Sequence, residues 1–262
     1  MQSAAPPVSV NPDRVGGLAW TRRTRGRLTG RERRRLLAAL AVGQVENVIG
    51  RARLALGRLP DGAGEIDVTS FVPPDSRLAR EAQEACAEQP PAVAAHSYRT
   101  WMYGLALAVL DAAELDRELF YCASLVHDFG IAASVPGRDF TLGGADRALA
   151  CATNAGVSHA DAERIADAIC VHTTPGISID RDGSLGCYVQ WGAMVDGAGL
   201  RLWDVSRDNV AAVLEAYPRG AGFKRELAAL MRTEAAAVPG GRFALLARCG
   251  VPLAVRMAPF DD

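Results

Sequence analysis

The sequence predicts an all-α protein, and three observations support that prediction. From about residue 65 onward, apolar residues recur at helical spacing in segment after segment, and none sustains the period-two alternation of a β-strand. Residues that commonly start and stop helices separate these segments. No glycine-rich phosphate loop follows a strand pattern, and no internal repeat is present. A bundle of helices is therefore expected.

The N-terminal 60 residues are expected to form an extension of this bundle. Residues 1 to about 17 are rich in proline, glycine and small residues, which predicts a disordered or loosely attached tail. An arginine cluster between Arg22 and Arg51 and an apolar-periodic stretch from Leu36 to Val48 predict one or two helices lying on the main body. The arginines could contact anionic partners, but without interleaved aromatic residues a solvated helix face is the favoured interpretation.

Residues 61–262 are expected to form a single helical domain. Ser76 or Asp75 is a plausible N-cap, Gly143-Gly144 opens a later helix that Gly156 ends, and Ser158 begins the next one. The helices expected from these signals cover 77–86, 91–113, 116–128, 145–155, 158–172, 185–203, 207–217 and 221–237.

Composition and charge exclude several classes of protein. The chain has 262 residues, a net charge of −1 and 49% apolar residues, enough for a sizeable core. Near-neutral charge argues against a binder of nucleic acid or of a membrane surface. The apolar stretch Leu36–Val42 is too short for an export signal despite the Arg22-Arg23 pair before it. Six scattered cysteines without a CxxC pair favour reduced core cysteines, so a cytoplasmic location is expected.

Histidines and aspartates in otherwise apolar helices suggest a metal site. His96 lies near the start of one helix, His127-Asp128 end another after a buried run, and His172 closes a third. Asp196 lies within the apolar stripe of a fourth helix, where an unpaired carboxylate is costly. Imidazoles and carboxylates that converge from separate helices suit a divalent transition metal. Taken singly, each histidine is more often a satisfied core residue, but the combination is much rarer by chance.

At these residues the chain resembles the HD superfamily of metal-dependent hydrolases, and within it the cyanamide hydratase-like branch. The resemblance covers about residues 65 to 235. It rests on PPDSRLAREA (73–82), HSYRTWMYG (96–104), SLVHDFG (124–130), RDFTLGGADRA (138–148), DAICVHTTPGI (167–177), QWGAMVDGAG (190–199) and YPRGAGFKRELAAL (217–230). It implies an HD-type helical bundle in which His96, His127, Asp128 and Asp196 bind the metal. Zinc is the metal expected first, with iron, manganese or nickel as alternatives.

One departure from the family pattern bears on the number of metals. Members with two metals place an extra histidine where this chain has Phe140, whereas His172 matches a further ligand of the second metal. One metal is therefore expected rather than two. His172 is then expected at the substrate pocket, as a general acid/base or as a structural residue.

The sequence also suggests where other polar and aromatic residues near the motif lie. Arg99, one turn after His96, is expected either to orient the substrate or to form a salt bridge with Asp128 or Asp196. His159 follows a helix cap and is expected to be exposed. The aromatic residues Tyr98, Trp101 and Tyr103 are expected in the core, with the alternative that one of them lines the pocket.

Three functions remain open at this stage. The resemblance favours a hydrolase or hydratase in which metal-bound hydroxide attacks a small C–N substrate such as a nitrile or cyanamide, with Asp128, His172 and Arg99 as catalytic residues. The first alternative is a phosphohydrolase acting on a nucleotide or phosphate monoester, helped by Arg99, Arg138 and Arg147. The second is a metal-binding module without turnover. The expected partners are a small-molecule substrate and, as an open option, further copies of the chain.

Overall fold

Residues 14–261, which the computed structural model describes, contain thirteen α-helices and no β-strand, so the all-α prediction is confirmed. The helices are α1 (Leu18–Thr24), α2 (Gly30–Ala55), α3 (Arg77–Ala87), α4 (Pro91–Leu110), α5 (Arg117–Val126), α6 (Thr141–Ala155), α7 (His159–Val171), α8 (Ile179–Asp182), α9 (Ser184–Ala198), α10 (Arg207–Ala216), α11 (Phe223–Ala237), α12 (Arg242–Arg248) and α13 (Val251–Arg256). Short 3-10 turns occur at Val68–Ser70, Ile131–Ala133 and Leu202–Asp204.

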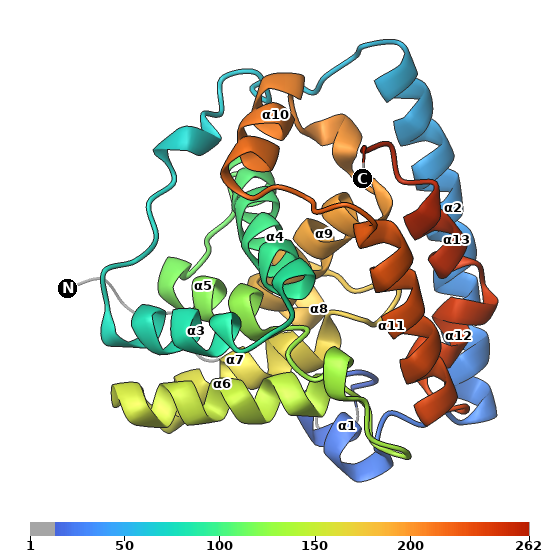
Figure 1. Cartoon of the computed structure of the whole chain (residues 1–262). Helices are drawn as coiled ribbons and strands as arrows, with labels where there is room; N and C mark the ends of the chain where they lie inside the picture. Colours follow the sequence, from blue (N-terminus) through green and yellow to red (C-terminus); the bar gives the residue numbers. More distant parts are fainter. Residues whose placement is uncertain (1–13, 262) are drawn as a thin grey trace.

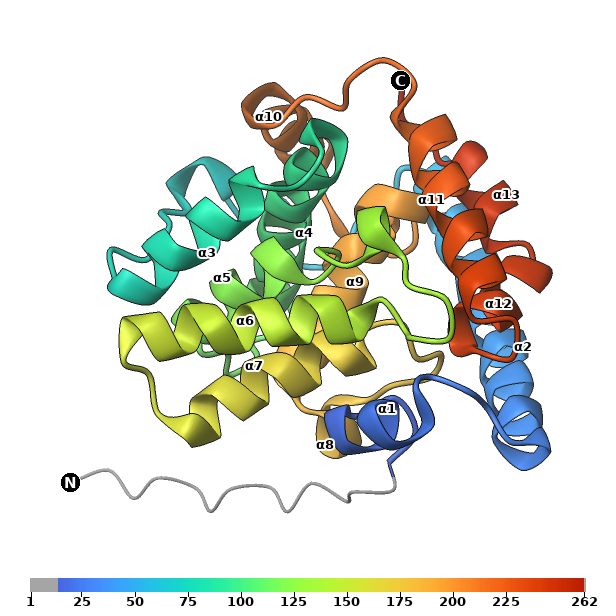
Figure 2. The same cartoon turned by 60° about the horizontal axis from the view of Figure 1, so that its bottom comes forward.

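Helices α4 and α9 run through the middle of the molecule (Figures 1 and 2). On one side lie α3, α5, α6 and α7, and on the other lie α11, α12, α13 and α2. The largest cluster of buried apolar residues joins α4 and α9 to α3, α5, α6 and α7. A second cluster joins α11 to α12 and α13, and it also includes Val93 of α4 and Phe140. The start of α4 therefore lies where the two cores meet.

Two glycines let α4 and α9 approach each other closely. A Cβ atom on Gly192 would lie 2.2 Å from the backbone oxygen of Thr100, and one on Gly104 would lie 2.5 Å from that of Tyr188. Only glycine fits such a contact without separating the helices. This crossing brings polar residues of α4 within hydrogen-bonding distance of Asp196 on α9.

The predicted helix caps are present in the structure. Ser76 Oγ accepts a hydrogen bond from the amide of Ala79, and Ser158 Oγ accepts one from the amide of Asp161, both at 3.1 Å. Gly156 ends α6 with a φ of +76°. The caps follow from side-chain chemistry that is local in sequence, which is why they could be predicted.

The start of α6 differs from the prediction that Gly143-Gly144 open it. The helix begins at Thr141, whose amide and hydroxyl both donate to Asp139 Oδ1. The glycines instead serve close packing, because a Cβ on Gly144 would lie 2.6 Å from the backbone oxygen of Val126 and 2.9 Å from that of His127. Gly144 thus lets α6 pack directly against the turn that carries His127.

The N-terminal segment is partly more ordered than predicted. Residues 1–13 lie outside the described residues, but Arg14 is buried and forms ion pairs with Asp167 and, at 2.7 Å, with Asp182. The prediction of a loosely attached tail is therefore wrong for residues 14–17. Two helices follow, α1 and α2, and the arginines Arg31, Arg34 and Arg35 at the start of α2 are exposed, as the solvated-face interpretation predicts.

Other differences concern short helices and one boundary. The sequence did not predict α8, α12 or α13, each seven residues or shorter. Such lengths are too short for helical periodicity to be recognised. Helix α9 ends at Ala198, earlier than predicted, because Gly199 takes a φ of +69°.

The structure also bears on the cysteines and on membrane-spanning helices. All six cysteines are unpaired and five of them are buried, in agreement with the expectation of reduced core cysteines. Among residues 14–261, no helix combines the length and apolar character needed to cross a bilayer.

Candidate metal centre

Helix α4 and the end of α5 bring three of the predicted ligands together. His96 lies in the second turn of α4, and His127 and Asp128 follow the last residue of α5. One ligand atom from each of the three lies within 4.8 Å of the others. His96 Nε2 is 3.7 Å and His127 Nε2 is 3.5 Å from Asp128 Oδ2. All three residues are buried, so this group could hold one metal ion away from bulk water.

His172 joins this group from the end of α7. Its Nε2 atom lies 3.5 Å from the second oxygen of Asp128, Oδ1, and its ring centroid lies 5.0 Å from that of His127. The two oxygens of Asp128 therefore face different neighbours. Oδ2 faces His96 and His127, whereas Oδ1 faces His172.

The backbone fixes the tautomer of two of these histidines. His127 Nδ1 lies 2.8 Å from the carbonyl oxygen of Ser124, and His172 Nδ1 lies 2.6 Å from that of Ile169. Because a carbonyl oxygen only accepts, both Nδ1 atoms carry the proton and donate it. In the neutral rings each Nε2 atom then keeps its lone pair, and both Nε2 atoms face Asp128.

The electrostatics of the group match the needs of a cation. Burial, with the nearby imidazoles of His172 and His96, lowers the pKa of His127 to about 3, so its ring is neutral at neutral pH. Burial alone would raise the pKa of Asp128, but the imidazoles around it outweigh burial and hold that pKa well below its usual range. Neutral imidazoles and an ionised carboxylate are the ligand forms that bind transition metals.

One polar atom in this group is left without a protein partner. His127 Nε2 is fully buried and has no hydrogen-bond partner among the described residues. An unsatisfied polar atom in the interior costs on the order of 1–3 kcal/mol. A metal ion bound between His96, His127 and Asp128 would satisfy this atom, so the residues present fit the ion that the sequence predicts.

Asp196, the fourth predicted ligand, is placed differently. Its Oδ2 lies 2.6 Å from His96 Nδ1, on the opposite edge of the ring from the atom that faces Asp128. Arg99 donates to both oxygens at 2.8 and 2.9 Å, and Arg219 donates to Oδ1 at 2.6 Å. Burial would raise the pKa of Asp196, but Arg99 and His96 outweigh burial and hold it well below its usual range. In this arrangement Asp196 orients His96 from behind, a common role for carboxylates beside metal ligands.

Arg99 takes the second of its two predicted roles. It is fully buried, and its guanidinium forms the bidentate pair with Asp196. Its Nη1 atom also donates to the backbone oxygens of Tyr217 and Pro218, each at 3.2 Å. Arg99 therefore connects α4, α9 and the segment before α11.

The apolar ring of Phe140, the residue on which the prediction of a single metal rests, lies beside His172. The centroid of the Phe140 ring lies 6.1 Å from that of His172 and 5.1 Å from that of Phe243. Phe140 is buried in the second core cluster and offers no ligand atom. The expectation of a single metal remains a prediction, supported by this apolar neighbour.

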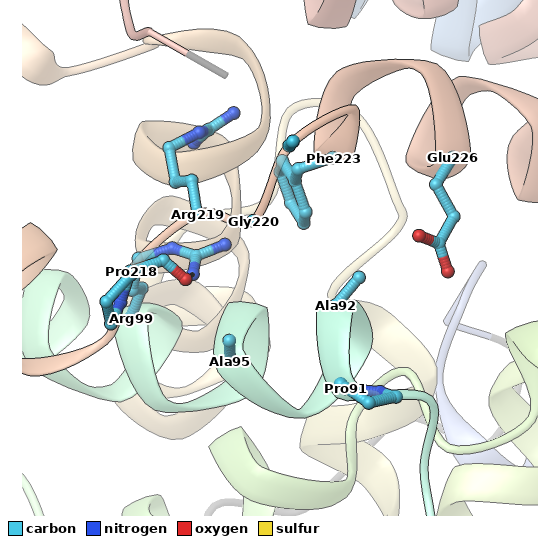
Figure 3. A pocket seen from close by; sticks show the side chains of 10 residues that line it. Pro91, Ala92, Ala95, Arg99, Pro218, Arg219, Gly220, Phe223 and Glu226 are labelled. Carbon is cyan, nitrogen blue, oxygen red and sulfur yellow. Dashed lines mark hydrogen bonds between the residues drawn. The ribbon is translucent and has the colours of Figure 1, made fainter.

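A surface cavity of about 350 Å³ lies between α4 and the start of α11. Figure 3 shows Ala92, Ala95 and Arg99 along α4 facing Arg219, Phe223 and Glu226 from the other side. A narrow crevice shares Ala92, Phe223 and Glu226 with this cavity and reaches His96, but it has no room for a water molecule. The Phe223 ring centroid lies 5.8 Å from that of His96. Phe223 thus lines both the cavity and the crevice and lies next to His96.

The remaining predicted residues lie away from the centre. Arg138 pairs with Asp146 and Arg147 pairs with Glu88 on the molecular surface. The side chain of His159 is 85% exposed, as predicted.

The predicted aromatic residues differ in burial. Trp101 and Tyr103 are buried, as expected. Tyr98 is only partly buried and stacks on Tyr217, with ring centroids 4.7 Å apart.

Two residues of the site were not predicted. Arg219 lies in the segment between α10 and α11, and Phe223 is the first residue of α11. Both guanidinium groups near Asp196 lie over the Phe223 ring, at 4.8 Å for Arg99 and 4.4 Å for Arg219. The sequence held one signal for them, because the turn-forming Pro218 and Gly220 flank Arg219 between two predicted helices. Nothing local shows that this turn folds back onto α9.

Neither a scan against models of protein families nor a search of the curated proteins finds a match to this chain.

Proposed function

We propose that this protein is a metal-dependent hydrolase or hydratase acting on a small C–N substrate of the nitrile or cyanamide type. The observation that carries the metal is the buried His127 Nε2 atom without a hydrogen-bond partner among the described residues, beside His96 and the ionised Asp128. The reaction type rests on the resemblance of the site motifs to the HD superfamily. His96, His127 and Asp128 would hold the ion, and Asp196 would orient His96.

A bound divalent transition metal supplies Lewis acidity and lowers the pKa of water at the site towards neutrality. Residues of the chain then accept the proton released from this water and transfer it. His172 Nε2 lies 3.5 Å from Asp128 Oδ1, so its lone pair can accept the proton and the ionised carboxylate stabilises the resulting imidazolium. The bond from His172 Nδ1 to the Ile169 carbonyl keeps the Nε2 lone pair aimed at Asp128. Protonated His172 could return the proton to the nitrogen of the substrate.

The route to the site favours a small uncharged substrate. The crevice at His96 is lined by Ala92, Val93, Phe223, Leu227 and Leu230, with Glu226 as its one acidic residue. A phosphate group would need a cationic partner there. Arg99 and Arg219, which line the neighbouring cavity, both pair with Asp196, and Arg99 also donates to two backbone oxygens. Arg138 and Arg147 form surface ion pairs, so these contacts support a nitrile-like substrate over a phosphate ester.

The metal is tested with a matched pair of histidine variants. We expect about one transition-metal ion per purified wild-type chain by elemental analysis, its loss in His127→Ala, and its retention in His159→Ala, whose exposed imidazole lies on the surface. Unchanged metal content in His127→Ala would contradict the site.

The reaction is tested with two substrate panels and the metal-loaded protein. We expect turnover of cyanamide or a simple nitrile by wild type and His159→Ala, and none by His127→Ala. Turnover of phosphomonoesters alone would select the phosphohydrolase alternative. No turnover of any substrate in either panel, despite bound metal, would reject this proposal in favour of a non-catalytic metal-binding module.

A further inference from the structure

Helix α2 packs against the body along only one of its faces. Leu36 is buried, and Leu40 contacts the cluster that includes residues of α11, α12 and α13. Further along, Gly50 packs on Trp203, because a Cβ there would lie 2.2 Å from the indole, and Leu54 contacts the main core. These positions recur at helical spacing and define the inner face of α2. Both views show α2 along one edge of the molecule (Figures 1 and 2).

The opposite, outer face of α2 is also apolar. Its large side chains are between 41% and 68% exposed. They are Leu37, Val42, Val45, Val48, Ile49 and Leu56, with the exposed alanines Ala38, Ala41, Ala52 and Ala55 between them. The charged residues from Leu37 to Leu56 are Glu46, Arg51 and Arg53, and none of them belongs to this apolar set. A helix that is apolar on both faces is typical of one buried on both sides, so a partner is needed for the outer face.

The exposed apolar area of the outer face is large enough for a protein–protein interface. From Leu37 to Leu56 it runs about 28 Å along the helix at 1.5 Å per residue. Its exposed apolar area is on the order of 700 Å², above the ~300–600 Å² of the largest patch on a typical monomer. Two such faces in contact would bury on the order of 1,400 Å², which is within the usual range for a stable dimer.

We infer that the outer face of α2 is the interface of a two-fold symmetric homodimer. A two-fold interface joins a surface to a copy of itself, so it must be self-complementary. An uncharged stripe meets this condition because no like charges meet across it. Apolar residues at 38, 41, 45, 48, 52 and 55 alternate in steps of three and four, which is the spacing by which paired helices interlock.

The charges at the start of α2 select the antiparallel orientation. A parallel pair would place Arg31, Arg33, Arg34 and Arg35 of one copy against those of the other. In an antiparallel pair the four arginines are kept apart and lie near the last turn of the partner's α2, which carries a single arginine, Arg53, and whose helix dipole favours cations.

Sedimentation equilibrium on the full chain between 1 and about 100 μM tests the inference. We expect wild-type mass to approach twice 27.7 kDa, and the variant V45E/I49E to sediment at 27.7 kDa. Both substituted side chains are exposed in the single chain, so their replacement should leave the helical circular dichroism unchanged. The matched control is Val72→Glu, which introduces the same charge at a valine that is 79% exposed outside α2, and it should remain dimeric.

Three results would overturn the inference. Wild type that is monomeric across the range refutes it whatever the variants do. A V45E/I49E protein that stays dimeric, or a Val72→Glu protein that becomes monomeric, places the interface elsewhere. Monomeric wild type that co-sediments with phosphatidylglycerol vesicles, and loses this with V45E/I49E, would instead assign the outer face to an anionic membrane surface.

Discussion

Replacing Asp196 with asparagine tests the buried charge cluster behind His96. The carboxylate is fully buried and accepts hydrogen bonds from Arg99, Arg219 and His96 at 2.6–2.9 Å. Asparagine keeps the shape but removes the charge, which leaves two buried guanidinium groups without their shared anion. Loss of one partner of a buried ion pair costs about 3–5 kcal/mol. At about 2–4 °C per kcal/mol for a large domain, the melting temperature should fall by roughly 6–20 °C.

The assay is thermal unfolding followed by circular dichroism, with Asp146→Asn as the matched control. Asp146 pairs with Arg138 at the surface, where such a pair contributes about 0–1 kcal/mol, so that control should melt within about 4 °C of wild type. If Asp196→Asn melts no lower than Asp146→Asn, the argument from the buried cluster is refuted. The same variant distinguishes an orienting carboxylate from a direct metal ligand. Loss of a carboxylate that only orients His96 should weaken metal binding about 10–100-fold without abolishing it.

Three other perturbations probe packing, protonation and access. Gly192→Ala should cost about 1–3 kcal/mol and lower metal retention, because its Cβ would lie 2.2 Å from the Thr100 oxygen at the α4–α9 crossing. In denaturant unfolding its control is Gly197→Ala, whose nearest neighbour would be 3.8 Å away and which should be neutral or slightly stabilising. Burial raises the pKa of Glu234 to about 7, so between its ordinary value of 4.5 and about 7 the folded state binds more protons and stability falls as pH rises. Glu234→Gln should therefore be more stable than wild type at pH 8 and equal to it at pH 4.5; equal denaturation midpoints at pH 8 would contradict this. Phe223→Ala should open the crevice to His96 and speed extraction of the metal by a chelator in a stopped-flow assay, and an unchanged rate would place the route elsewhere.

The parts of the structure that depend on local chemistry could be predicted from the sequence. Helix caps such as Ser76 and Ser158 act on amides three residues away, and long helices show their buried face in the spacing of apolar residues. The convergence of His96 with His127 and Asp128 was predicted from their combination and from the family resemblance, and the structure places them together.

The parts that depend on distant residues could not be predicted. That Asp196 sits in an apolar helix was visible, and a partner was therefore expected for it. The pair with Arg99 was one of the predicted alternatives. The second cation, Arg219, depends on the 217–222 segment returning to α9, a contact that leaves no periodic signal. Arg14 was likewise predicted to lie in a loose tail, because its partners Asp167 and Asp182 are distant in sequence.

The fixed tautomers of the histidines have a consequence for how metal binding relates to folding. Asp196 and the carbonyls of Ser124 and Ile169 already hold the rings in place through their Nδ1 atoms. An arriving ion would find its ligands assembled by a large helical core, unlike the small zinc domains whose chains order only around the metal. Chelation should therefore empty the centre without unfolding the protein, and the ion should be exchangeable for another of similar size.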